Sequence, residues 1–176
     1  MANQFTYQVI KDTTERAVIK LTGFFDGSGQ ESNAARIQAN TLYGALDANS
    51  VPLRSALSLS NTALSYYGLS IFKIWYDCVN NTEGGVELYW SANTSRTIAY
   101  LSGTYEYDSA SNWITIPNNA AGSANCYGDI GLRTFGYQAN SSYTILLEVR
   151  KDNAQYQRGQ FNDPAAFNYP PYGIAP

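Results

Sequence analysis

The segment SSYTILLEVR, residues 141–150, decides the fold class of this chain. Its side chains alternate between a mostly apolar set and a more polar set, and such alternation is typical of a β-strand with one buried face. The apolar set is Tyr143, Ile145, Leu147 and Val149, and the other set is Thr144, Leu146, Glu148 and Arg150. The segment therefore predicts a half-buried strand.

Further segments of this kind follow one another along most of the chain. Residues 16–22 alternate cleanly, residues 69–76 are apolar on both faces as in a strand buried on two sides, and residues 86–90 alternate again. Residues 34–42 fit a short helix or a strand, and a strand is favoured. The expected strands cover residues 5–10, 16–22, 34–42, 53–65, 69–76, 86–90, 97–102, 112–116, 131–135 and 142–149. This pattern predicts an all-β, antiparallel two-sheet sandwich or jelly roll.

The end of the chain has a different composition. Four of the six prolines lie in residues 164–176, and no periodicity remains there. Because proline fixes an extended backbone and removes hydrogen-bond donors, we expect a β-sandwich domain at 1–152 and an extended C-terminal arm at 153–176. Large aromatic groups on such an arm need a place to dock, on the domain itself or on a neighbouring subunit. The predicted partner-binding residues are Tyr156, Phe161, Phe167, Tyr169 and Tyr172.

Charge is scarce and nearly balanced, with 11 basic and 14 acidic residues and a net charge of −3. The absence of a Lys/Arg cluster argues against nucleic acid and against an anionic membrane surface as partners. The first residues carry no basic and apolar secretory signal, and the apolar runs are far shorter than the roughly 20 residues that span a bilayer. We therefore expect synthesis in a cytoplasm.

The groups that most catalytic sites need are missing. The chain contains no histidine, which removes the commonest general base and the usual zinc sites. Glu87, Glu106 and Glu148 are the carboxylates in strand-rich regions that a glycosidase mechanism could use, but each also fits a solvent-facing position of an alternating strand. Cys78 and Cys126 are expected to be free thiols. The prediction is a non-enzymatic protein with no catalytic residues, no cofactor and no metal site.

Aromatic residues are unusually abundant, with fifteen Tyr, seven Phe and three Trp. Core filling and cross-strand pairing explain most of them. Contacts with other proteins are the second interpretation, since exposed Tyr and Trp are enriched at interfaces. Stacking platforms for sugars are the third.

Several segments resemble a family of small virion structural proteins of tailed phages, especially phages of marine cyanobacteria and other marine bacteria. They are VIKDTTERAVIKLTGFFDGSGQES (9–32), LSIFKIWYDCVNNTEGGVELYW (69–90), GDIGLRTFGY (128–137) and SSYTILLEVRKDNA (141–154). The resemblance covers roughly residues 5–154 and leaves the arm outside. Its segments are strands and turns, so it implies kinship and location in a virion but carries over no active-site residues.

What the resemblance implies agrees with the composition. The expected function is that of a capsid decoration, or cement, protein that stabilises the particle through protein–protein contacts, including contacts of its arm. The alternative is a neck, tail or fibre component, including a carbohydrate-binding host-recognition module. The expected partners are the major capsid protein or neck and tail proteins together with further copies of the chain, in the virion after synthesis in the host cytoplasm.

Overall fold

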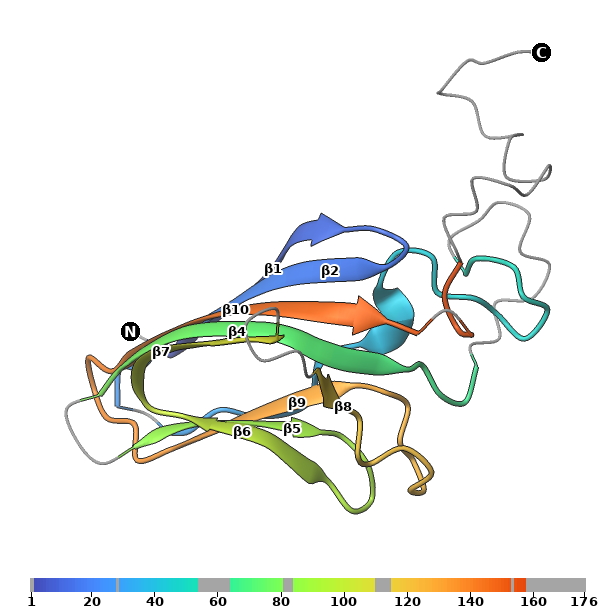
Figure 1. The fold of residues 1–176 in the computed structure, drawn as a ribbon. Helices are drawn as coiled ribbons and strands as arrows, with labels where there is room; N and C mark the ends of the chain where they lie inside the picture. Colours follow the sequence, from blue (N-terminus) through green and yellow to red (C-terminus); the bar gives the residue numbers. More distant parts are fainter. Residues whose placement is uncertain are drawn as a thin grey trace, which may run out of the picture.

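A computed structural model describes residues 2–27, 29–53, 64–80, 84–109, 115–152 and 154–157. Two antiparallel sheets pack face to face, which confirms the predicted all-β two-sheet sandwich (Figure 1). Sheet A has the order β1 (Gln4–Asp12), β2 (Arg16–Phe24), β10 (Ser142–Lys151), β4 (Leu69–Val79) and β7 (Gly103–Asp108), and β8 (Ile116–Pro117) also pairs with β4. Sheet B has the order β3 (Ser32–Ile37), β9 (Ile130–Phe135), β5 (Gly85–Trp90) and β6 (Arg96–Leu101), and a short 3-10 helix, η1 (Ala39–Thr41), follows β3.

Strand β10 lies at the centre of sheet A and pairs with β2 on one side and β4 on the other. Leu147 stands opposite Ile19 of β2 and Ile74 of β4, and all three side chains are buried. The alternation predicted from the sequence of β10 is confirmed, because its apolar set is buried while Leu146 and Glu148 of the other set are half-buried.

Sheet B supplies the other half of the core. Its inward side chains are buried to the same degree, and Trp90 of β5 is the largest of them. The Trp90 indole N–H donates to the Pro117 carbonyl at 3.1 Å, so the polar atom of this ring is satisfied inside the core. The inward residues of sheet B include Ile37, Val86, Leu88, Trp90, Leu101, Ile130 and Leu132.

Three elements differ from the sequence-based expectation. The strand expected at 34–42 ends at Ile37, and residues 39–41 form η1. β5 was expected to bury one face, but all six of its residues are buried. Side chains on the outer face of sheet B cover Glu87 and Tyr89. β7 was not expected as a separate strand. Gly103, with φ of +71°, lets the chain turn sharply from β6 in sheet B to β7 in sheet A.

The structure agrees only in part with three further expectations, which concern the strands at 53–65 and 112–116 and the burial of both faces of β4. Most of the strand expected at 53–65 lies outside the described residues, and of that expected at 112–116 only Ile116 lies in a described strand, β8. β4 buries Leu69, Ile71, Ile74 and Cys78, while its other side chains are half-buried except Val79, which is exposed.

The two neighbouring leucines of β10 test this assignment of faces. Leu147→Ala should lower the free energy of unfolding by about 2–5 kcal/mol, because it removes a fully buried side chain from the core. Leu146→Ala, on the half-buried outer face, should lower it by clearly less. Urea unfolding of both variants measures the difference, and an equal or larger loss at Leu146 would contradict the assignment.

Candidate binding surfaces

The three carboxylates that the sequence offered for catalysis each face a basic side chain. Glu148 pairs with Arg16, with 3.0 Å between Oε1 and Nη1, while Glu106 pairs with Lys73 and Glu87 pairs with Arg133. Glu106 and Glu148 lie on sheet A and Glu87 lies on sheet B. Among the described residues no group of three or more Cys, Asp or Glu side chains is arranged to hold a metal ion.

The two cysteines are separate, buried thiols without a disulfide. Burial raises the pKa of the Cys78 thiol to about 11. A thiol with such a pKa is almost entirely protonated at neutral pH and is therefore a poor nucleophile.

Glu87 and Arg133 form a polar centre on the outer face of sheet B. The Glu87 side chain is only 3% exposed, and it accepts hydrogen bonds from Arg133 Nε and from the Thr97 hydroxyl, the latter at 2.7 Å. Burial raises the pKa of Glu87, but the hydrogen bonds from Arg133 and Thr97 outweigh burial and bring its pKa below the ordinary value of 4.5. Because Glu87 binds Arg133 through Nε, the positions that the two terminal amino groups of Arg133 can take are restricted.

Aromatic rings flank this polar centre. Tyr89 lies across Gly131, which leaves no room for a side chain there, and the Arg133 guanidinium carbon lies 5.4 Å from the centre of the Tyr89 ring. Tyr100 and Phe135 are 65% and 44% exposed, and their ring centres are 6.2 Å apart at an angle of 78°. We call Tyr100, Arg133 and Phe135 the sheet B platform.

The second surface lies along β1, the outermost strand of sheet A. All of its residues are exposed except Asp12, which is half-buried. Phe5, Tyr7 and Val9 are 36–40% exposed, and Ile10, at the β-bulge that follows Val9, is 53% exposed; we call these four residues the β1 surface. Phe5, Tyr7 and Val9 stand opposite Gly23, Leu21 and Ile19 of β2, so they continue the inward face of sheet A beyond the covered core.

A polar side chain of sheet B contacts β1. Arg36 of β3 donates to the Thr6 carbonyl at 2.7 Å, and its Nε lies 3.2 Å from Glu31, which in turn accepts from the Tyr143 hydroxyl. The Phe5 ring also packs on Phe25, which follows β2, with their ring centres 5.4 Å apart. The apolar side chains of β1 are therefore left half-exposed.

The end of β10 is held by a buried cation. The Lys151 side chain has no exposed area, and its ammonium group donates to Asp12 and to the carbonyls of Thr13 and Tyr43. All three N–H bonds are thus used, which compensates for the burial of the charge. Burial lowers the pKa of Lys151, and the contact with Asp12 raises it in part. This group connects the centre of sheet A to the end of β1.

Tyr156 packs at the same end of the domain, and its predicted contact with a partner stays a prediction. It is 1% exposed, its hydroxyl donates to the Ala39 carbonyl at 2.8 Å, and its ring centre lies 5.6 Å from that of Tyr67. The chain therefore packs on the domain at least as far as Gln157, beyond the boundary expected after residue 152. Phe161, Phe167, Tyr169 and Tyr172 lie outside the described residues.

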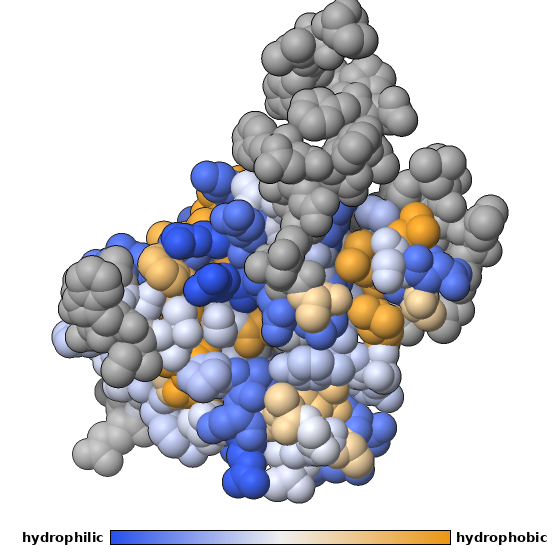
Figure 2. Space-filling view, turned by 45° about the vertical axis from the view of Figure 1, so that its right-hand side comes forward, coloured by the Kyte–Doolittle hydropathy of each residue, from blue (hydrophilic) through white to orange (hydrophobic). Residues whose placement is uncertain are grey.

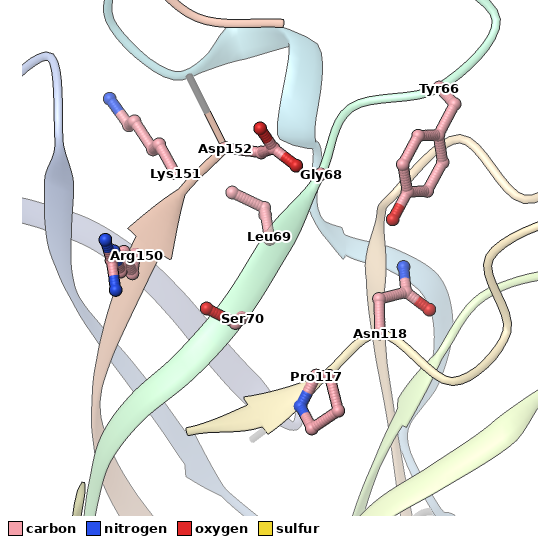
Figure 3. A pocket seen from close by; sticks show the side chains of 9 residues that line it. All are labelled: Tyr66, Gly68, Leu69, Ser70, Pro117, Asn118, Arg150, Lys151 and Asp152. Atoms are coloured by element: carbon pink, nitrogen blue, oxygen red, sulfur yellow. The ribbon is translucent and has the colours of Figure 1, made fainter. Parts of the chain in front are cut away.

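A cavity of about 420 Å³ opens beside the ends of β4 and β10. Figure 3 shows Tyr66 and Asn118 on one side of it and Arg150 and Lys151 on the other, with Leu69 and Ser70 between them. Burial raises the pKa of the Tyr66 hydroxyl, so this group stays protonated at neutral pH. The lining is mixed and polar, and nothing in it singles out a ligand.

Sequence reasoning did not find the sheet B platform or the β1 surface as sites. The cross-strand neighbours of Arg133 and Tyr100 depend on which strands pair, and the sequence does not give that order. The excess of tyrosine was a signal for exposed rings, but it did not say which rings. On the side shown in Figure 2 the described residues form small apolar areas among polar ones.

None of the protein-family models, curated protein sequences and solved structures compared with this chain matches it. Within the described ranges, no helix has both the length and the hydropathy needed to cross a bilayer.

The Glu87–Arg133 pair predicts a specific acid sensitivity. Because the folded protein holds the pKa of Glu87 below 4.5, this carboxylate adds stability above about pH 4.5, and the contribution is lost as the pH falls through the folded pKa. Glu87→Gln should therefore be less stable than the parent at pH 7, and its stability should fall less between pH 7 and pH 3. Urea unfolding at both pH values measures this, and parallel losses in the two proteins would contradict it.

Proposed function

We propose that this chain is a structural subunit of a bacteriophage particle, with capsid decoration as its first position and the neck, tail or fibre as the alternative. It acts by protein–protein contacts with the major capsid protein, with neck and tail proteins or with further copies of itself. The resemblance of residues 5–154 to small virion proteins of tailed phages supports the location. The observation that carries the contact role is the β1 surface.

An exposed edge strand with apolar side chains is unusual in a protein that works alone. Such edges pair with other chains, and soluble proteins commonly cover them or place charges on them. β1 is nine residues long and has only Lys11 and Asp12 as charged residues, both at its end. Tyr and Phe are also enriched at protein interfaces. A neighbouring subunit that covered this strand would bury apolar area worth roughly 25 cal/mol per Å² before ordering costs are subtracted.

The rest of the described chain suits a repeated building unit. A continuous core joins the two sheets, and the carboxylates Glu87, Glu106 and Glu148 are ion-paired. Contacts that are individually modest become strong when many copies bind neighbours at the same time. The four aromatic residues of the predicted arm that follow Gln157 are proposed to add to these contacts.

Purified particles test the proposal. Mass spectrometry of intact particles should find the chain, in hundreds of copies per particle for a decoration protein and far fewer for a neck, tail or fibre part. Ile10→Glu, which places a charge on the β1 surface, should lower incorporation several-fold. Val79→Glu is the matched control, because Val79 is 51% and Ile10 is 53% exposed. Absence of the chain from the particles would overturn the proposal, and equal incorporation of both variants would remove β1 from it.

The sheet B platform favours a second candidate, carbohydrate binding. Sugars present apolar C–H faces to aromatic rings and hydroxyl groups to fixed donors. Tyr100 and Phe135 supply rings at a steep angle to one another, and Glu87 holds Arg133 beside them as a donor. This arrangement fits a host-recognition module better than a cement protein.

A glycan array with the purified protein tests this candidate. Saturable binding should be weakened at least several-fold by Tyr100→Ala and left intact by Tyr105→Ala. The two tyrosines are 65% and 66% exposed, but Tyr105 lies on sheet A. No binding to any glycan, or equal losses in both variants, would eliminate the platform as a sugar site.

A further inference from the structure

The last described residues and the end of β1 are attached to the same short loop. The Gln157 N–H donates to the Gly44 carbonyl at 2.7 Å, and the N–H of the preceding residue in that loop, Tyr43, donates to Asp12 Oδ2 at 2.8 Å. Lys151 binds Asp12 and the Tyr43 carbonyl at the same place. The part of the predicted arm that follows Gln157, residues 158–176, therefore begins next to the C-terminal end of β1, and this part is called the arm below.

The arm and the β1 surface have matching chemistry. Charge is sparse in both, with Arg158 and Asp163 in the arm and Lys11 and Asp12 at the end of β1. The arm carries Phe161, Phe167, Tyr169 and Tyr172, and the β1 surface presents half-exposed Phe, Tyr, Val and Ile side chains. Each is an apolar element that water solvates poorly, so covering one with the other lowers the free energy of both.

We infer that, in the free subunit, residues 158–176 bind the β1 surface of their own chain. The inference rests on the proposed function in that both elements are then held for contacts with neighbours, which displace one from the other during assembly. The arm supplies its own site with an effective concentration that reaches the millimolar range for a short tether, far above that of a second copy in dilute solution.

The lengths permit this arrangement. A nine-residue strand is about 30 Å long at roughly 3.3 Å per residue, whereas nineteen extended residues reach about 60 Å. Prolines at 164, 170 and 171 break the run of backbone donors, and Arg36 already occupies the Thr6 carbonyl. Backbone pairing along the whole of β1 is therefore excluded, and the inferred contact rests on apolar side chains.

Photo-crosslinking in the full-length chain tests the inference directly. A benzophenone amino acid replaces Phe167, and equal amounts of unlabelled and ¹⁵N-labelled chain are mixed at low micromolar concentration before irradiation. Cross-links should join residue 167 to peptides that contain Gln4–Asp12, with both halves carrying the same isotope. Cross-links to other parts of the domain would overturn the inference, and so would mixed-isotope pairs, which would assign the site to the arm of a second copy.

Limited trypsin digestion of full-length variants gives a second, independent readout. Trypsin cleaves after Arg158, and an arm held on β1 protects this bond. Ile10→Glu should accelerate the cleavage several-fold, whereas Val79→Glu, equally exposed but at the far end of β4, should leave the rate unchanged. Equal rates in the two variants would contradict the inference. Neither experiment uses particles, so their failure leaves the copy-number test of the proposed function standing.

Discussion

The pairing of β10 with both β2 and β4 is the constraint on which the rest of the structure depends. Nine residue pairs join β10 to β2 and ten join it to β4, although β2 lies more than a hundred residues earlier in the chain. Sheet A therefore cannot become continuous until the last strand is in place. Such long-range pairing costs loop-closure entropy before contacts repay it, which is typical of slowly folding β-proteins. The fully buried set on β10 repays this cost, because it faces the core at every second residue.

The central position of β10 also determines which strand lies at the edge of sheet A. With β10, β2 and β4 in the middle, β1 becomes an outer strand that sheet B does not cover, and its apolar residues stay half-exposed. Lys151, at the end of β10, then fixes the position of this margin through Asp12 and Tyr43. The same loop receives Gln157, so one buried cation sets the end of the core, the end of β1 and the start of the arm. The candidate contact elements are thus a consequence of the sheet order.

The sequence predicted those parts of the fold that the residue pattern of a single strand determines. The alternation in β2 and β10 gave the buried faces, and the number and spacing of such segments gave the fold class. The sequence did not predict the burial of side chains that residues from other segments cover. Glu87 occupies a polar position of an alternating strand, yet Arg133 and Thr97 on the adjacent strands bury it. Tyr156 lies in an aperiodic polar segment, but its ring packs beside Tyr67 and its hydroxyl donates to the Ala39 carbonyl. Lys151 is the last residue of β10, and the three acceptors that bury its ammonium group come from segments distant in the sequence.

The arrangement of charge has a consequence for how the surfaces bind. Several of the chain's few charged side chains are ion-paired within the domain, as in Glu148–Arg16, Glu106–Lys73 and Glu87–Arg133. The β1 surface itself consists of uncharged side chains. Association through it therefore gains little from electrostatic steering, and moderate salt screens little of its stabilisation. Binding of this kind is slow at each encounter and depends on buried apolar area. A subunit that contacts two neighbours at the same time through such surfaces gains avidity, which compensates for the modest strength of a single contact.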